Sequence, residues 1–366
     1  MKRESVAAGR FYPDSIQELD SFFGKAFKTP HKKYSQIKGI LVPHAGYIYS
    51  GNNAALAYSC LKDIDFDTAI IIGTAHTVAL NKCALFEKGS FITPYGEVEI
   101  DENINKKLIN SDFFEYSLRA HENEHSIEVQ IPFLQYFKKN RFKIVPIVIN
   151  THNEKILKGA GIAIGKILKE TNSILIISSD LSHYPPKEIA MVSDRALIES
   201  YSMAILNKDI EFFSLAYSLL ENKYSREMDT AACGFSAMSC GGEAFIEAGF
   251  NNFDFIQYIN SGDISGDDSN VVGYACGVFL PYKDMSGNIK LSENEKQELL
   301  SYARKSIEYT IKNKKKMTNI KSERVNFNIP AAVFVTLTKK GNLRGCIGTM
   351  KPNSLLIDAV CDYAYN

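Results

Sequence analysis

The strongest constraint on the fold of this 366-residue chain is a series of short, continuous apolar runs. They alternate with helical patterns, are rich in β-branched residues, and occupy Ile37–Val42, Thr68–Ile72, Lys143–Ile149 and Ser173–Ile177. Strands that are covered on both faces lack the alternation of polar and apolar residues seen in half-exposed strands. The runs therefore predict an α/β fold with a mostly parallel central sheet flanked by helices.

Other segments add detail to this first domain. Ser15 and Glu18 have the spacing of a capping box and predict the start of a helix. The periodicity of Glu154–Glu170 predicts an amphipathic helix between two strands, and Ser269–Leu280 is predicted to be the last strand. Pro146 interrupts the third apolar run and predicts a bulge or a sheet edge, because proline cannot donate a hydrogen bond to a neighbouring strand.

A break in this pattern after residue 282 predicts a second, smaller α+β segment. Ser292 and Glu295 predict a capping box. The helix that follows has a predicted apolar face of Leu299, Leu300, Ala303, Ile307 and Ile311. A hairpin is expected to turn near 340–342. We therefore divide the chain into a first domain at 1–282, a linker at 283–291 and a second domain at 292–366.

Composition restricts the partners and the compartment. Lys plus Arg and Asp plus Glu each number 42, so the zero formal charge gives no indication of a nucleic-acid or anionic-membrane surface. The sequence has no apolar stretch of roughly 18 residues and no secretory signal at its start. The seven cysteines are odd in number and form no C-x-x-C pair, which indicates reduced thiols. We expect a soluble cytoplasmic protein with no nucleic-acid or membrane partner.

Polar side chains follow three of the predicted strands at the point where each strand ends. His44 follows the first apolar run, His76 the second, and Asp180 the fourth, with His183 three residues later. The carboxyl ends of parallel strands meet at one edge of a sheet, so these side chains should converge there. Each alone would more often be a capping or surface residue. Together they predict a metal or acid–base site, since imidazole serves both uses.

Two further segments are candidates for the same site. His125 and Glu128 are three residues apart and would share a face of a helix, either in the site or at a solvated helix start. Cys233 and Cys240 lie near the start of another predicted helix, where the helix dipole favours a reactive thiolate. The alternative is that either cysteine is a small buried apolar residue. Dinucleotide, Walker, G-x-S-x-G and H-E-x-x-H motifs are absent.

Six segments place the chain beside a known family. GRFYP, VPHAGYIYSG, IIIGTAHT, EHSIEVQIPF, ISSDLSHY and CGFSA occur in the order found in the Memo family, and about residues 4–281 resemble it. The resemblance implies a fold like the catalytic subunit of class III extradiol dioxygenases. It also implies one metal ion held by His44, His76 and Cys233, which selects Cys233 over Cys240. Iron(II) is the expected ion, with copper or zinc as alternatives.

The resemblance also suggests roles for the surrounding residues. His183 matches an acid/base histidine of the dioxygenases, and Asp180, His125 and Glu128 match polar residues of the same pocket. Tyr47 and Tyr49 would line its mouth. Because a thiolate replaces the dioxygenase carboxylate, the expected function is an iron- or copper-dependent, oxidoreductase-like activity on a small molecule or peptide.

Two alternative functions agree with the same resemblance. In one, the protein is a non-catalytic adaptor that binds a peptide or a protein in a vestigial cleft. In the other, it is a subunit of a modification system. Its partner there would be a radical-SAM protein, because the two are often encoded side by side.

The second domain carries its own resemblance. The segment LRGCIGT (Leu343–Thr349) resembles the hallmark of the AMMECR-type domain. That domain is longer than the segment present here, so we expect a partial domain. The hallmark positions Arg344 and Cys346 receive no chemical role.

Overall fold

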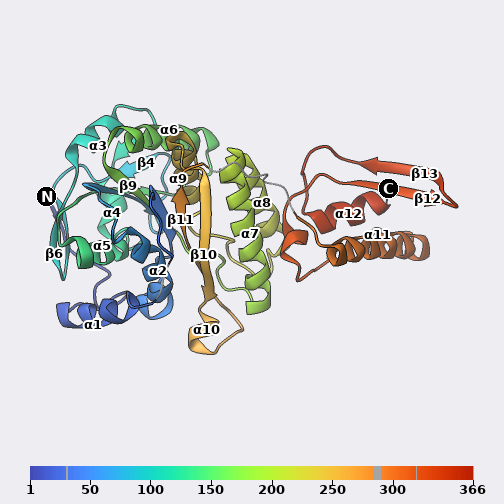
Figure 1. Ribbon diagram of the computed structural model, residues 1–366, viewed down its shortest axis with the longest axis horizontal. Helices are drawn as coiled ribbons and strands as arrows, with labels where there is room; N and C mark the ends of the chain where they lie inside the picture. The colour runs from blue at the N-terminus through green and yellow to red at the C-terminus, as the bar shows by residue number, and fades with distance from the viewer. Residues whose placement is uncertain (30–31, 283–289, 319, 366) are drawn as a thin grey trace.

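The computed structural model describes residues 1–29, 32–282, 290–318 and 320–365 (Figure 1). It is a mixed α/β structure in which helices flank a large central sheet. A small C-terminal unit with helices and a hairpin follows (orange to red in Figure 1) and lies beside α7 (Lys187–Asn207) and α8 (Ile210–Lys223). The predicted fold class is confirmed at this level. Residues 283–289 of the predicted linker lie outside the described part of the chain.

Among the described residues, the central sheet has eight strands in the order β10-β11-β2-β9-β3-β8-β4-β7. All four predicted strands are at its centre and run parallel to one another. The bounds are β2 (Gly39–Val42), β3 (Thr68–Thr74), β4 (Cys83–Leu85), β7 (Phe114–Tyr116), β8 (Lys143–Ile149), β9 (Ser173–Ser178), β10 (Asn252–Asn260) and β11 (Gly273–Leu280). The predicted last strand is β11, which pairs antiparallel with β2.

The prediction of a bulge or an edge at Pro146 is wrong. β8 lies between β3 and β4, and its pairing with β3 runs without interruption from Lys143 to Ile149. On its other side, β8 pairs with β4 only at Ile147 and Val148, so Pro146 lies outside that ladder. The missing N–H therefore removes no bond to β3 or β4, which is why proline is tolerated inside the sheet.

Helices cover both faces of the sheet, as the unbroken apolar runs predicted. Alternate strand residues belong to two separate buried clusters, for example Ile70 and Ile72 in one and Ile71 in the other. The first face is covered by α3 (Glu102–Ile109), α6 (Glu154–Glu170), α7 (Lys187–Asn207), α8 (Ile210–Lys223) and α9 (Phe235–Ala248). The second is covered by α1 (Ile16–Ala26), α2 (Asn52–Leu61) and α5 (Ile131–Lys138).

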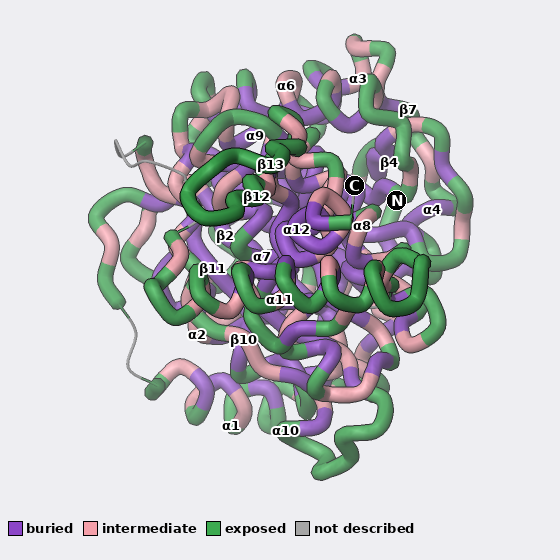
Figure 2. Tube along the Cα trace, turned by 90° about the vertical axis from the view of Figure 1, so that its right-hand side faces the viewer, coloured by how far each residue is buried: buried purple, intermediate pink, exposed green. Residues whose placement is uncertain are grey.

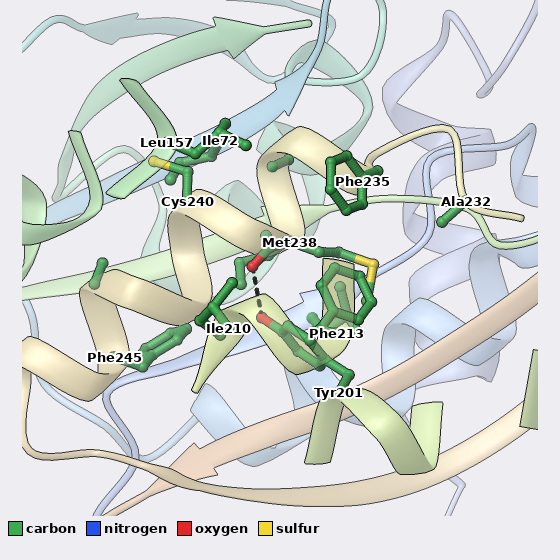
Figure 3. Close-up of a cluster of buried hydrophobic side chains, with 14 of the residues drawn as sticks. Ile72, Leu157, Tyr201, Ile210, Phe213, Ala232, Phe235, Met238, Cys240 and Phe245 are labelled. Carbon is green, nitrogen blue, oxygen red and sulfur yellow. Dashed lines mark hydrogen bonds between the residues drawn. The ribbon is translucent and has the colours of Figure 1, made fainter. Parts of the chain in front are cut away.

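The cluster around α9 shows how tightly the first face is packed. In Figure 3 the Tyr201 hydroxyl donates to the Met238 carbonyl oxygen across a 2.9 Å hydrogen bond, and Cys240 points into the apolar cluster. Gly161 lets α6 approach α9, because an added Cβ would lie 2.5 Å from the Cys240 carbonyl oxygen. This close packing holds α9 against its neighbours, and the segment just before α9 contributes to the candidate site below.

The remaining short elements connect the sheet to the surface. They are β1 (Lys2–Arg3), β5 (Ser90–Thr93) and β6 (Gly96–Glu99), which form a small sheet, and η1 (Tyr47–Gly51), α4 (Leu118–Glu122), η2 (Glu128–Gln130) and α10 (Gly262–Ser265). Within the described residues, no helix is both long and apolar enough to span a membrane.

The C-terminal unit contains α11 (Glu293–Asn313), η3 (Val325–Asn328), β12 (Phe334–Lys339), β13 (Asn342–Gly348) and α12 (Leu356–Tyr365). The predicted capping box and hairpin are confirmed. Figure 2 shows α12 largely buried and the hairpin exposed. The predicted apolar face of α11 is too wide: Leu300 and Ile311 are 63% and 74% exposed, because the stripe packed against α12 is narrow.

Candidate metal centre

The three strand ends named in the sequence analysis lie side by side. β9 lies between β2 and β3, and all three are parallel. His44, His76 and Asp180 each follow their strand by two residues. The His44 and His76 ring centroids are 5.2 Å apart, and the Asp180 carboxylate accepts a 2.7 Å hydrogen bond from the His44 N–H. The structure therefore brings these three residues together at one sheet edge.

The orientation of His44 is fixed by a buried hydroxyl. Ser178 Oγ donates to the Ser126 carbonyl oxygen and accepts from the Gln130 amide, so its remaining lone pair accepts the Nδ1–H of His44 at 3.1 Å. Nε2 then carries the free lone pair, 3.2 Å from Cys233 Sγ. Burial lowers the pKa of His44 to about 3, which keeps the ring neutral. A neutral imidazole is the form that binds metals.

Glu124 is a site residue that sequence reasoning missed. Its buried carboxylate accepts from His76 Nδ1 at 2.9 Å and from the backbone N–H groups of His76 and Ser126. Burial alone would raise the pKa of Glu124, but these hydrogen bonds and the His76 charge lower it to about 2. Glu124 in turn raises the pKa of His76 against the effect of burial. The HENEHSIE segment has three acidic residues, and spacing gave no reason to choose this one.

His125 lies beside the other two imidazoles. Its ring stacks on His76 at 4.6 Å between centroids and 22° between planes, and it is perpendicular to His44 at 5.5 Å. Phe11 stacks on it at 4.2 Å. Burial lowers the pKa of His125 to about 4. The residue lies between α4 and η2, so the expected helical face shared with Glu128 does not form.

Glu128 points away from the imidazoles. Its fully buried carboxylate receives Arg3 Nη1 at 2.5 Å, the Tyr12 hydroxyl at 2.7 Å, and the backbone N–H groups of Val6 and Ala7. The structure thus separates His125 and Glu128, which the sequence analysis grouped in one pocket. Glu128 instead anchors the N-terminal segment.

Cys233 is the cysteine beside the imidazoles, whereas Cys240 is buried in the core. Gly234 allows the segment before α9 to approach β9, because a Cβ there would lie 2.3 Å from Ser179 Oγ. Burial raises the pKa of the Cys233 thiol well above its usual value. Desolvation therefore opposes the easier ionisation that the dipole at a helix start would favour.

His183 has an unpartnered nitrogen. Its backbone is held by hydrogen bonds to Thr230 and from Asp229, each at 3.0 Å. Among the described residues, its buried Nε2 atom has no hydrogen-bond partner. Burial lowers the pKa of His183, and the nearby Asp180 carboxylate opposes that shift. Burial also raises the pKa of Asp180.

A buried carboxylate supports the loop that carries His183. Asp194 accepts hydrogen bonds from the Ser182 N–H and hydroxyl, both at 3.0 Å, and from the Tyr258 hydroxyl at 2.8 Å. Burial raises the pKa of Asp194 to about 7. No local pattern marks Asp194 in the sequence, because nothing near it distinguishes it from an exposed carboxylate on a helix.

The two tyrosines predicted at the mouth of the site differ in position. Tyr49 is exposed. Tyr47 is buried: its hydroxyl donates to the Val129 carbonyl oxygen at 2.7 Å, and its ring packs 4.8 Å from Phe133. The prediction that Tyr47 lines the mouth is not met, because the η1 turn directs its side chain into the core.

Two overlapping groups of side chains could hold a metal ion. They are His44, His76 and His125, and His44, Asp180 and Cys233, with the ligand atoms of each group within 4.8 Å of one another. Their chemistry fits a transition metal, because imidazole nitrogens and a thiol are preferred donors for such ions. The fold and the site define an α/β protein with a candidate metal centre at the carboxyl edge of its sheet.

Comparison with known proteins agrees with this description. The family model described as Memo-like protein matches residues 3–278, and the model AMMECR1 matches residues 300–366. The MEMO1 family protein of Nitrosopumilus maritimus (strain SCM1) is 34% identical over 287 residues, covering 76% of this chain and 100% of the relative. The MEMO1 family protein of Aquifex aeolicus (strain VF5) is 35% identical over 280 residues, covering 76% and 99%. The chain belongs to the Memo family, which confirms the resemblance seen in the sequence.

Proposed function

We propose that this protein binds a transition metal ion at the strand-end cluster and serves as a metal-dependent, oxidoreductase-like enzyme. The family resemblance suggests His44, His76 and Cys233 as ligands, with iron(II) as the first choice and copper or zinc as alternatives. The observation that carries the proposal is the 3.2 Å contact between His44 Nε2 and Cys233 Sγ beside the His76 ring. His44 belongs to both groups of possible ligands, one with His76 and His125 and the other with Asp180 and Cys233.

The surrounding hydrogen bonds support metal binding. Metal-ligating histidines usually donate their other ring N–H to a carboxylate or another acceptor, which orients the ring. His44 Nδ1 has Ser178 as this partner, and His76 Nδ1 has Glu124. The Nε2 atoms of both histidines are then the nitrogens that would bind the metal ion. The buried Cys233 thiol would lose its proton on binding, since the thiolate is the ligand form.

The chain's own residues have distinct parts in the proposed chemistry. Bound iron or copper would supply the redox chemistry. Asp180 holds the backbone N–H groups of His44 and Ala45, so it positions a ligand. His183, with its unpartnered Nε2, would accept or return a proton of the substrate. The His76 side chain is 29% exposed, so a small molecule or peptide would approach from its side.

Metal analysis of anaerobically purified protein, with an electron paramagnetic resonance spectrum, tests the proposal. We expect a bound transition metal in the native protein and its loss in His44→Ala. The variants His76→Ala and Cys233→Ser measure how much metal binding depends on each of the other two proposed ligands. His152→Ala is the matched control, because His152 is exposed and stacks on Phe235 outside the cluster. Unchanged metal content in all three cluster variants would refute the assignment.

A further inference from the structure

We propose that a small cavity between α6, α8 and α9 binds a primary alkylammonium group, supplied by a free amine or by a lysine side chain. The cavity has a volume of about 30 Å³ and is lined by residues of these three helices. It shares no residue with the two groups of possible metal ligands. The inference is therefore independent of the proposed metal binding and adds a second ligand site.

A buried hydroxyl without a partner lies at this cavity. Ser239 of α9 lines the cavity, and the residue is only 1% exposed. Among the described residues, Ser239 Oγ has no hydrogen-bond partner. Because an unpaired buried hydroxyl is destabilising, a ligand that bonds to this oxygen would relieve that cost.

The charge around the cavity is negative. Three carboxylates line it, from Glu154, Glu211 and Glu243, together with the ammonium group of Lys158. Burial raises the pKa of Glu243, and repulsion from the Glu211 carboxylate raises it further, although Lys158 opposes this shift. Lys158 is exposed and does not bond to Ser239 Oγ. A second cation would therefore balance the charge and reach the unpaired hydroxyl.

The spacing of these acceptors suits an ammonium group better than a metal ion. Within the described part of the chain, the three carboxylates do not form a group with oxygens within 4.8 Å of one another, as a shared ion requires. An ammonium group has three N–H donors, and each reaches an acceptor across about 2.8 Å. It can therefore bond to Ser239 Oγ and to the carboxylate oxygens around it.

The size of the cavity limits the ligand. One water molecule takes about 30 Å³ in the liquid, so an NH₃⁺ head group fits the cavity and a quaternary ammonium group does not. Leu157 of α6 and Ile210 of α8 are buried, line the cavity and pack around α9 in Figure 3. Their methyl groups would contact the carbon chain next to the head group. The site thus favours an ammonium group on an aliphatic chain.

Isothermal titration calorimetry of the native protein, at constant ionic strength, is the first test. The probes are n-butylammonium chloride for a free amine and Nα-acetyl-lysine amide for a lysine side chain. Tetramethylammonium chloride is the control, because it carries the same charge without N–H donors. We expect saturable binding of at least one amine and none of the control, and the tighter of the two amines identifies the source. No saturable binding of either amine, or equal binding of the control, would overturn the inference.

Two cavity variants provide the second test, with circular dichroism to confirm that each is folded. Ser239→Ala and Glu243→Gln should each weaken binding of the amine by about tenfold or more, because each removes an acceptor for a charged donor. Glu247→Gln is the matched control and should leave binding unchanged, since Glu247 lies one turn further along α9 and pairs with Lys169 at 2.6 Å. Native affinity in both cavity variants would contradict the assignment.

Urea denaturation of the ligand-free Ser239→Ala variant separates a ligand-binding hydroxyl from a structural one. Because the native hydroxyl has no partner, its removal should leave the urea midpoint unchanged or raise it. A lower midpoint in the variant would show that Ser239 Oγ bonds within the protein, and the proposed site would then be lost.

Discussion

Replacing Glu128 tests whether this residue is structural, as its contacts indicate, or part of the pocket, as the family motifs suggest. The Arg3 and Glu128 side chains are 3% and 0% exposed, and their atoms approach to 2.5 Å. In Glu128→Gln, the Arg3 guanidinium would remain buried without a counter-ion. Removing one partner of a buried ion pair costs about 3–5 kcal/mol. We therefore expect the free energy of unfolding to fall by about that amount.

Urea denaturation followed by circular dichroism measures this loss by linear extrapolation. Glu97→Gln is the matched control, because Glu97 pairs with Lys2 at 2.8 Å on the same small sheet but is exposed. The control should show little change. Metal content should stay at the native level in both variants. A stability change in Glu128→Gln below about 1 kcal/mol, with loss of bound metal, would refute the structural assignment.

Two further predictions concern stability. Because burial raises the pKa of Asp194 from 3.8 to about 7, the folded state binds this proton more tightly than the unfolded chain. The free energy of unfolding should therefore fall by on the order of 4 kcal/mol as pH rises from about 4 through about 7. Urea denaturation of Asp194→Asn over the same pH range should no longer show this fall. If the pH profiles of the native protein and the variant superimpose, the prediction is contradicted. An alanine Cβ at Gly161 would lie 2.5 Å from both the Cys240 carbonyl oxygen and the Glu243 Cβ, so Gly161→Ala should cost about 1–3 kcal/mol. In the control variant Gly345→Ala, the added Cβ would have no atom of the described residues within 4 Å, so the melting temperature should change little. If both variants lose the same stability, α6 and α9 can move apart without cost, which would contradict the prediction.

The sequence predicted the centre of the sheet well because the signal there is local. Four apolar runs gave the four central strands, and the rule for parallel strand ends placed His44, His76 and Asp180 together before any contact was known. The flanking strands β4 and β7 are each three residues long, too short to carry a pattern. The prediction of a bulge or an edge at Pro146 was wrong because the effect of a missing N–H depends on whether that side of the residue faces a paired strand.

The polar residues around the site were harder to assign. Within HENEHSIE, Glu124 supports the imidazoles and Glu128 pairs with Arg3, although both are buried acids four residues apart. The difference comes from the irregular backbone between α4 and η2, which directs them to opposite partners. Tyr47 was placed at the mouth by its position next to His44, but η1 turns it inward.

By itself, the sequence determined the kind of sheet, the helices on its two faces and the strand ends that carry the imidazoles. Buried strands and their ends can be predicted from short runs of apolar residues, because these patterns depend only on residues that are close together in the sequence. Only the tertiary structure decided which carboxylate orients which histidine, and that His44 meets Cys233, 189 residues away along the chain. Such contacts depend on how distant segments pack, and hydrogen bonds reach only about 3 Å, so no local pattern encodes them.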